Sequence, residues 1–272
     1  MNNSLPARQR SIYDQKDTGQ GEEEYIVGAF QQKQNEKKVT AYAIDRNDSG
    51  LPEEKSEMDG PGSQITKVYF VRHAQPEYAW EEDRTRPLTD EGRRDTEIVL
   101  DFLKDKEIDV FYSSPYKRSY DTIATTAAFY GKEIMTDERL REREKGPDGN
   151  EYGMFEKRWA DHDYHEENGE SISMVQRKNM EALTEILSRN KGKKIVIATH
   201  GTALSTILHF YHAEFGCKDF LRIIDWMPYI VELDFDADRL LSEKEHCYIE
   251  KEFQGNKRAD HAKEQHLEGV VK

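Results

Sequence analysis

Hydrophobic residues gather between residues 65 and 235, and the segments on either side are mostly polar. Within that region, short runs of β-branched and aromatic residues alternate with longer segments in which apolar residues recur every three or four positions. The short runs predict buried strands and the longer segments predict amphipathic helices. This alternation is typical of an α/β domain, so we expect a three-layer, doubly wound and mainly parallel sheet.

The same pattern locates the individual elements. Strands are predicted at 68–71, 109–113, 194–199 and 229–235. Helices are predicted from Thr89, which is a good N-cap, from Ser114 to about Tyr130, over 170–189, and from about Thr202. Residues 131–169 are irregular and charged, and a long excursion of this kind in such a fold is expected to lie over the active site as a lid. Its aromatic side chains are expected to form the lid's own small core.

Three of the predicted strands end in polar residues that suit the binding of an anion. Because the carboxyl ends of parallel strands meet at one edge of an open sheet, we expect these residues to face one another there. In chain order they are Arg72, His73, Arg118 and His200.

The polar segments on either side of the apolar region are predicted to form separate parts of the chain. Two β-type runs, at 25–30 and 39–44, predict a small N-terminal β-hairpin, and a hairpin alone is marginal in water. It must therefore pack on the main domain or on a second chain, which leaves a homo-oligomer open. The predicted parts are a disordered tail at 1–24, the hairpin and a linker at 25–63, the main domain at 64–250 and a charged tail at 251–272.

Charge and composition narrow the class of protein. The net charge of −14 disfavours nonspecific binding to nucleic acid or to anionic membranes. We find no signal peptide and no apolar run of the ~20 residues that span a bilayer, so we expect a cytoplasmic protein. Cys217 and Cys247 have no metal-ligand spacing and are interpreted as free thiols. The densest group of metal-ligand residue types, 161–165, is typical of a solvated loop, and we predict no metal or other cofactor.

Four short motifs resemble those of the histidine phosphatase superfamily, the phosphoglycerate mutase-like proteins. Ala74 stands where that family most often has glycine, which is a mild departure. The resemblance covers roughly residues 65–235 and implies the same α/β fold. The matching motifs are Val71-Arg72-His73-Ala74, Ser113-Ser114-Pro115-Tyr116-Lys117-Arg118-Ser119, Leu140-Arg141-Glu142 and Ala198-Thr199-His200-Gly201.

The predicted site is suited to a phosphoryl group. Arg72 and Arg118 can each grip it with two charge-assisted hydrogen bonds. Gly201 and Thr202 begin a predicted helix, and a helix N-terminus is a natural anion site. His200 would donate to the phosphoryl oxygens and stabilise the charge of the transition state.

The resemblance also implies the catalytic roles. His73 would attack phosphorus as a neutral imidazole and form a phosphohistidine, its pKa lowered by the neighbouring arginines. Glu142 would be the proton donor, because the family carries its acid in a matching Leu-x-Glu. Arg143 matches a substrate contact in mutase relatives, and a solvated charge is the other interpretation.

The segment after His73 favours a phosphatase. Residues 75–92 resemble the small phosphatase branch and lack the Asn-rich aromatic segment of the mutases. We therefore predict a metal-independent phosphatase that acts on a small-molecule phosphomonoester. Two alternatives stay open, a mutase-type phosphoryl transfer and a non-catalytic scaffold that binds a phosphorylated ligand.

Overall fold

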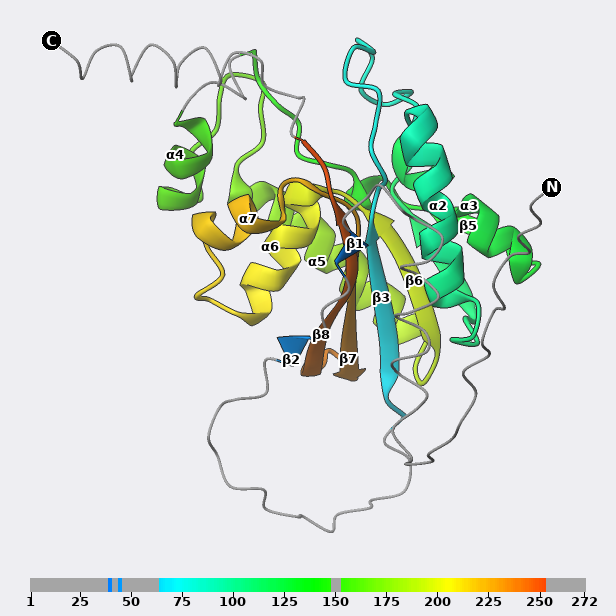
Figure 1. The fold of residues 1–272 in the computed structure, drawn as a ribbon. Coiled ribbons are helices and arrows are strands. Elements are labelled where there is room, and N and C mark those ends of the chain that lie inside the picture. Colours follow the sequence, from blue (N-terminus) through cyan, green and yellow to red (C-terminus); the bar gives the residue numbers. More distant parts are fainter. Residues whose placement is uncertain (1–38, 41–43, 46–63, 148–152, 253–272) are drawn as a thin grey trace, which may run out of the picture. The chain divides into compact units, whose positions relative to one another are not determined.

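The computed structural model describes residues 39–40, 44–45, 64–147 and 153–252. In this part of the chain eight strands form one mixed sheet, in the order β1-β8-β7-β3-β6-β4-β5, with β2 also paired to β8. Helices lie on both sides of the sheet (Figure 1). The predicted three-layer, doubly wound α/β architecture is therefore confirmed.

One half of the sheet is parallel, as the sequence predicts. It contains β3 (Thr66–Arg72), β6 (Lys194–Thr199), β4 (Val110–Ser113) and the short β5 (Ile134–Thr136). β3 pairs in parallel with β6, β6 with β4 and β4 with β5. The carboxyl ends of β3, β4 and β6 therefore lie at the same edge of the sheet.

The other half is antiparallel and is more extensive than predicted. β7 (Trp226–Asp236) pairs with β3, and β8 (Arg239–Glu250) pairs with β7. β8 is an additional strand, and β1 (Val39–Thr40) and β2 (Ile44–Asp45) pair with it. The first run of the predicted hairpin, 25–30, lies outside the described residues, and the hairpin stays a prediction.

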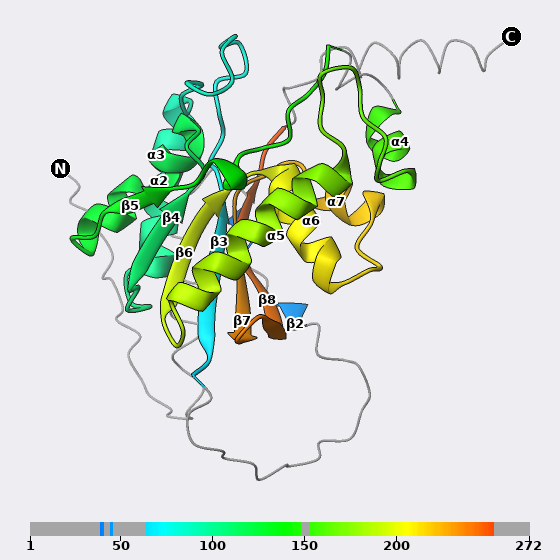
Figure 2. The same cartoon turned by 180° about the vertical axis from the view of Figure 1, so that it is seen from behind.

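The helices divide between the two faces of the sheet (Figures 1 and 2). Thr89 caps the first helix as predicted, because its hydroxyl accepts from the Gly92 backbone N–H at 2.9 Å. One face carries α2 (Asp90–Leu103) and α3 (Lys117–Phe129). The other carries α5 (Ile172–Arg189), α6 (Gly201–Tyr211) and α7 (Cys217–Ile223), with α4 (Met154–Ala160) beyond α7.

The start of α3 differs from the prediction. The sequence places the N-cap at Ser114, whereas α3 begins at Lys117 with Tyr116 as its N-cap. The Ser114 hydroxyl accepts from the Tyr116 backbone N–H at 3.2 Å and also contacts His200. Ser114 therefore shapes the turn before α3 and belongs to the site.

A large apolar core fixes the central strands. Val68 and Phe70 of β3 and Ile195 and Ile197 of β6 are fully buried against the α5–α7 side. Burial of such side chains stabilises by about 1.5–3 kcal/mol each. The ends of β3 and β6 are thus held by strands that are themselves anchored in the core.

The excursion before α5 is partly ordered. It contains the 3-10 helix η1 (Glu138–Leu140) and α4. Phe155 and Trp159 of α4 pack on Phe220 of α7, with ring centroids 5.3 and 5.8 Å apart. These aromatic side chains serve packing, but they pack on α7 rather than forming a separate core of the excursion, and the role of the excursion as a lid stays a prediction.

The ordered fold continues past the predicted end of the domain at residue 250. Lys251 is 7% exposed, and its ammonium group pairs with Glu91 at 2.7 Å and with Asp95. The first residue of the expected charged tail is therefore an anchor that ties the end of β8 to α2.

Candidate active site

The ends of β3, β4 and β6 bring the predicted residues together. Arg72, His73, Arg118 and His200 are 5%, 6%, 4% and 0% exposed. Arg118 Nε donates to His73 Nε2 at 3.3 Å, and the two histidine rings have centroids 5.2 Å apart. Residues 45 to 128 positions apart in the sequence thus form one buried cluster of two guanidinium groups and two imidazoles.

His73 is oriented by its backbone. Its Nδ1 lies 2.8 Å from the carbonyl oxygen of Ala74, and since a carbonyl only accepts, Nδ1 carries the proton. Nε2 therefore has a lone pair, which accepts from Arg118. Burial lowers the pKa of His73 well below its usual range, and the charges of Arg118 and Arg72 lower it further. The imidazole is neutral at neutral pH, and its Nε2 is unprotonated.

His200 is held in the opposite tautomer. Its Nε2 lies 2.8 Å from the Ser114 hydroxyl and 3.1 Å from that of Ser119. The Ser119 hydroxyl uses its proton on the Thr199 carbonyl at 3.2 Å, so it cannot also donate to Nε2. The Ser114 hydroxyl, the nearer of the two, accepts from the Tyr116 backbone N–H, and we assign its own proton to Nε2. The proton then sits on Nδ1. Burial lowers the pKa of His200 well below its usual range, followed by the charge of Arg118, so this ring is also neutral.

Several buried donors in this cluster have no partner among the described residues. They are Arg72 Nε, His200 Nδ1 and the Thr199 hydroxyl, and Thr199 pairs with Arg72 in the sheet register. Buried polar groups are normally hydrogen-bonded, so donors without partners indicate a ligand that accepts. Gly201 lets the Arg72 guanidinium lie close to the start of α6, because a Cβ at this position would be 3.2 Å from Arg72 Cζ. The cluster is suited to an oxyanion such as phosphate.

Glu142 lies at the N-terminus of α6. Its carboxylate accepts from the backbone N–H groups of Thr202 at 3.1 Å, Ala203 at 3.2 Å and Arg143 at 2.7 Å. The predicted proton donor is therefore next to the strand-end cluster. The Thr202 N–H, predicted to bind phosphate, is occupied by Glu142, so that contact requires the carboxylate to move.

The segment that carries Glu142 is clamped by Glu170. This carboxylate accepts two hydrogen bonds from Arg141, at 2.8 and 2.9 Å, and one from Lys178 at 2.7 Å. It also accepts from the Glu144 backbone N–H at 2.8 Å. Burial alone would raise the pKa of Glu170, but these donors outweigh it and the pKa is lowered. Glu170 is thus an ionised carboxylate that holds residues 141–144 in place.

Arg143 is not a solvated charge. Its side chain is buried, donates to Glu166 at 2.8 Å and to the Glu170 carbonyl at 3.0 Å, and Glu166 also pairs with Arg158. In this structure it is part of an internal ion-pair network rather than a group presented to a substrate. The interpretation as a solvated charge is wrong because the sequence does not show that Glu166 lies 23 positions away on the same buried patch.

Two residues of the loop between β3 and α2 join the site without having been predicted. Asp83 pairs with Arg118 at 3.2 Å, and the Tyr78 hydroxyl donates to the sulfur of Met227 at 3.4 Å. Burial raises the pKa of Tyr78, whereas the charges of Arg72 and Arg118 lower it. The charge-rich pattern of residues 77–86 gives no local sign of either contact.

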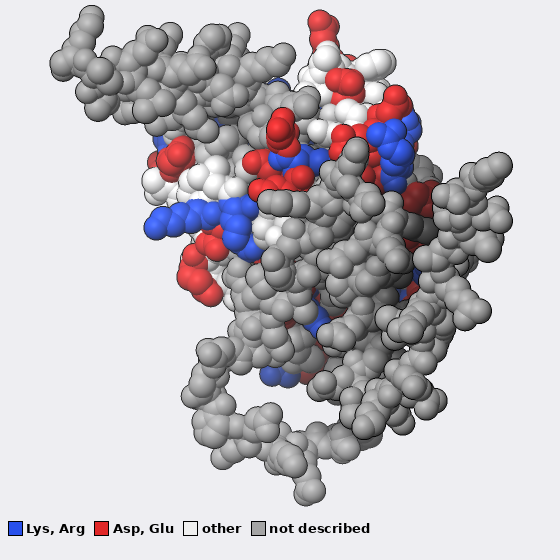
Figure 3. All heavy atoms as spheres, in the orientation of Figure 1, with Lys and Arg blue, Asp and Glu red and all other residues white. Residues whose placement is uncertain are grey.

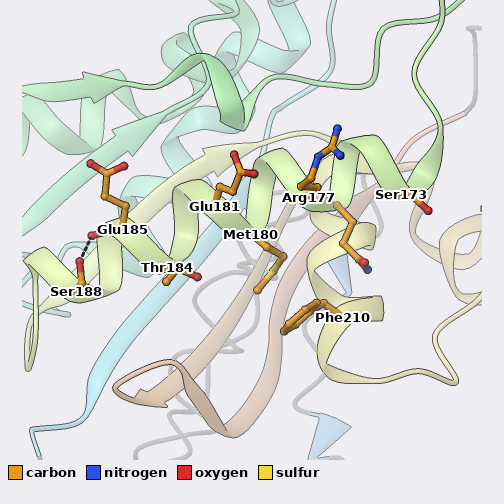
Figure 4. Close-up of a pocket in the computed structure, with 9 residues that line it drawn as sticks. Ser173, Arg177, Met180, Glu181, Thr184, Glu185, Ser188 and Phe210 are labelled. Atoms are coloured by element: carbon orange, nitrogen blue, oxygen red, sulfur yellow. Dashed lines mark hydrogen bonds between the residues drawn. The ribbon is translucent and has the colours of Figure 1, made fainter. Parts of the chain in front are cut away.

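A groove lies away from this cluster. It has a volume of about 610 Å³ and runs along α5 beside the exposed Phe210 of α6 (Figure 4). Its lining is polar on α5, with Met180 as the apolar neighbour of Phe210. None of its lining residues is a predicted site residue, so it does not change the location of the candidate site.

The described residues contain neither a cluster suited to a metal ion nor a helix that could span a membrane. No group of three or more His, Cys, Asp or Glu side chains in these residues is arranged to hold a metal ion. No helix in the same part of the chain is long and apolar enough to cross a membrane.

Comparison with known proteins places this arrangement in a family. Phosphoglycerate mutase-like protein 4 from Arabidopsis thaliana is 28% identical over 208 residues, which are 68% of this chain and 87% of that protein. Putative phosphoserine phosphatase 2 from Hydrogenobacter thermophilus is 34% identical over 93 residues, 30% of this chain and 42% of that protein.

Solved structures share the fold. A mycobacterial glucosyl-3-phosphoglycerate phosphatase superposes with a TM-score of 0.57 at 16% identity, covering 69% of this chain and 100% of that one. A phosphoserine phosphatase from Entamoeba histolytica gives 0.56 at 21%, covering 69% and 98%. The family model of the histidine phosphatase superfamily (branch 1) matches residues 68–239, which hold the whole strand-end cluster. The chain belongs to the histidine phosphatase superfamily.

Proposed function

We propose that this chain is a metal-independent phosphatase that hydrolyses a small phosphomonoester through a phosphohistidine on His73. One observation carries the proposal: His73 is a buried neutral imidazole whose unprotonated Nε2 faces the guanidinium of Arg118. Membership of the family and relatives named as phosphatases support a phosphatase or a related phosphoryl-transfer enzyme.

In the first step the phosphoryl group would bind between the two arginines and His200 Nδ1. A phosphomonoester carries roughly two negative charges near neutral pH, which two guanidinium groups balance. His73 Nε2 attacks phosphorus, the bond from phosphorus to the ester oxygen breaks, and that oxygen takes a proton from Glu142. The alcohol leaves and the phosphoryl group stays on His73.

In the second step water attacks the phosphohistidine. Glu142, now a carboxylate, takes a proton from the water, the bond from phosphorus to Nε2 breaks, and inorganic phosphate is released. His200 and the arginines stabilise the equatorial oxygens in both transition states. Since these side chains supply the positive charge, the reaction as proposed needs no metal ion.

The proposed substrate class is supported by the relatives and by the burial of the site. Curated relatives include phosphoserine phosphatases from Hydrogenobacter thermophilus and a metal-independent phosphoserine phosphatase from Arabidopsis thaliana. The two arginines and two histidines of the site are at most 6% exposed, which favours a small ester over a macromolecule. A small phosphorylated metabolite is the proposed substrate.

A mutase-type phosphoryl transfer is the second candidate. The relative that aligns over 87% of its own length is named mutase-like, and another is a 2,3-bisphosphoglycerate-dependent mutase from Thermoplasma acidophilum. The same phosphohistidine would then pass its phosphoryl group to a second hydroxyl rather than to water. Incubation with 3-phosphoglycerate distinguishes the two, because a mutase forms the 2-isomer and a phosphatase forms inorganic phosphate.

The proposed function is tested by hydrolysis of p-nitrophenyl phosphate with excess EDTA. Wild type is compared with His73→Ala and with His165→Ala, which removes an exposed histidine as a control. We expect EDTA-resistant turnover that His73→Ala abolishes and His165→Ala leaves intact. Quenched wild-type samples should contain an acid-labile, base-stable phosphoenzyme that is missing from His73→Ala. Turnover that EDTA removes contradicts the proposal, and phosphate binding by a folded protein without turnover on any phosphomonoester favours a scaffold.

A further inference from the structure

A carboxylate of the protein itself occupies the outer side of Arg118. Asp83 accepts through both oxygens, from Nη1 to Oδ1 at 3.2 Å and from Nη2 to Oδ2 at 3.4 Å, and its backbone carbonyl accepts from Nη1 at 2.7 Å. The Asp83 side chain is 36% exposed and that of Arg118 is 4% exposed. The carboxylate therefore lies between the buried guanidinium and the solvent.

This contact has the form in which arginine binds phosphate. Two parallel N–H donors facing two oxygens are the usual geometry of arginine with either carboxylate or phosphate. The third donor, Arg118 Nε, points the other way, to His73 Nε2. All three nitrogens of the guanidinium are thus engaged, and a phosphoryl group that approaches His73 finds Asp83 on the donors that it needs.

A second arginine stabilises the displaced carboxylate. Arg86 Nη1 also donates to Asp83 Oδ1, and Arg86 itself is anchored by its Nε and Nη2, which donate to the Trp80 carbonyl at 3.3 and 3.1 Å. Asp83 can therefore leave Arg118 and remain paired with Arg86 within its own loop. The carboxylate of Asp83 therefore stays paired after the exchange, whereas an unpaired charge in a partly buried site would be costly.

Other acidic side chains on the loop that carries Asp83 also oppose the binding of an anion. Glu77, Glu81 and Glu82 on the same loop are exposed, and Figure 3 shows acidic side chains, in red, on the loop that projects above β3. These negative charges repel an anion that approaches the site at low ionic strength, and salt screens the repulsion. Asp83 differs from them because it alone touches the guanidinium that binds phosphate in the proposed function.

We propose that Asp83 sets the phosphate affinity of this site by competing with phosphate for Arg118. The inference rests on the proposed function, in which Arg118 binds the phosphoryl group. Phosphate then binds by exchange with Asp83, and Asp83 returns to Arg118 when phosphate leaves. The competition weakens the binding of the ester and of the product alike, and it therefore limits inhibition by inorganic phosphate.

The test measures binding of inorganic phosphate by isothermal titration calorimetry, so that no turnover is needed. Asp83→Asn keeps the shape of the side chain and removes its charge. The matched control is Asp121→Asn, which makes the same change of charge one turn from Arg118, where Asp121 pairs only with Lys117 at 2.8 Å. Asp83→Glu keeps the charge, and thermal melting of each variant shows that it is folded.

We expect Asp83→Asn to bind phosphate about tenfold more tightly than wild type, because removal of one competing charge-assisted pair is worth about 1.4 kcal/mol. KM for p-nitrophenyl phosphate should fall in proportion without a rise in kcat, and the inhibition constant of phosphate should fall too. Asp121→Asn and Asp83→Glu should stay within about twofold of wild type. Mere structural damage to the loop would instead weaken binding and raise KM.

Three results overturn the inference. If Asp83→Asn binds phosphate no more tightly than wild type, Asp83 does not compete, and the proposed function is untouched because wild type still binds phosphate and turns over. If Asp121→Asn tightens binding as much as Asp83→Asn, the effect is one of net charge alone. A folded wild type that neither binds phosphate nor hydrolyses esters refutes the proposed function, and the inference with it.

Discussion

Glu170 offers the sharpest test of how the segment around Glu142 is positioned. In Glu170→Gln the side chain keeps its shape but loses the charge that holds Arg141 and Lys178. Lys178 is 13% exposed in its side chain and already has a lowered pKa because of burial. The variant leaves this buried ammonium without its main counter-charge.

The size of the effect follows from the contacts. Hydrogen bonds to a charged group are worth about 1.5–3 kcal/mol each, and an uncompensated buried charge costs about 3–5 kcal/mol. Arg141 can partly turn to solvent, so we expect a loss of about 3 kcal/mol. For a domain of this size that lowers Tm by roughly 6–12 °C. Glu185→Gln on α5 is the matched control, because Glu185 and Arg139 are about one-third exposed, Arg189 is 70% exposed, and such pairs are worth about 1 kcal/mol or less.

Activity provides the second readout. If Glu170 positions the proton donor, Glu170→Gln should lower kcat for alkyl phosphates, whose leaving group needs a proton, by more than for p-nitrophenyl phosphate, whose leaving group needs none. Glu185→Gln should lower neither. An equal fall for both esters would mean that Glu170 acts on the whole fold, or on the attack of water that both esters share, rather than on proton donation to the leaving group.

The pH dependence of stability checks the same reasoning. The folded pKa of Glu170 is lowered, so its stabilisation is complete above the unfolded value of about 4.3 and is lost as the pH falls through the folded value. The difference in unfolding free energy between wild type and Glu170→Gln should be constant from about pH 7 to 5 and shrink below about pH 4. A difference that persists at low pH would refute an ionic origin.

Three further outcomes are expected. Ser114→Ala removes the donor that fixes the His200 tautomer, and kcat should fall on the order of tenfold while unfolding in urea shifts by about 1 kcal/mol. Because burial and the arginines depress the pKa of His73, kcat/KM for an aryl phosphate should stay level as the pH falls through 6.5, and a decline centred there would show an unperturbed imidazole. Lys251→Met leaves the carboxylates of Glu91 and Asp95 without this cation and should cost about 3 kcal/mol in urea unfolding, with kcat unchanged.

The strand-end residues could be predicted because parallel strands impose a long-range rule. Once 68–71, 109–113 and 194–199 are interpreted as parallel strands, their carboxyl ends must share an edge, and Arg72, Arg118 and their histidines meet there whatever the loops do. The local pattern of apolar residues was sufficient for this step, since β3 and β6 are buried on both faces and β4 alternates between buried and half-buried positions.

The antiparallel half could not be predicted in the same way. β8 carries Ser242 to Lys244 in its middle, a charged pattern that is typical of a loop, and its intermediate and exposed positions show why it lacks an apolar run. β5 has three residues and lies at the sheet edge. Both strands exist because a neighbouring strand offers its backbone, which is a tertiary cause that no local pattern reports.

The contacts of Asp83 and Glu142 explain how an anion site persists in a chain of net charge −14. Arg118 is nearly inaccessible, and a buried cation needs a partner. Asp83 supplies that partner, while Glu142 occupies the N-terminal N–H groups of α6 and both imidazoles stay neutral. The charges of Arg72 and Arg118 are then balanced by two carboxylates. An arriving phosphate dianion keeps this balance if Asp83 moves to Arg86 and Glu142 is protonated, which is the state a proton donor requires. The same two carboxylates would thus stabilise the site without ligand and prepare it for the reaction.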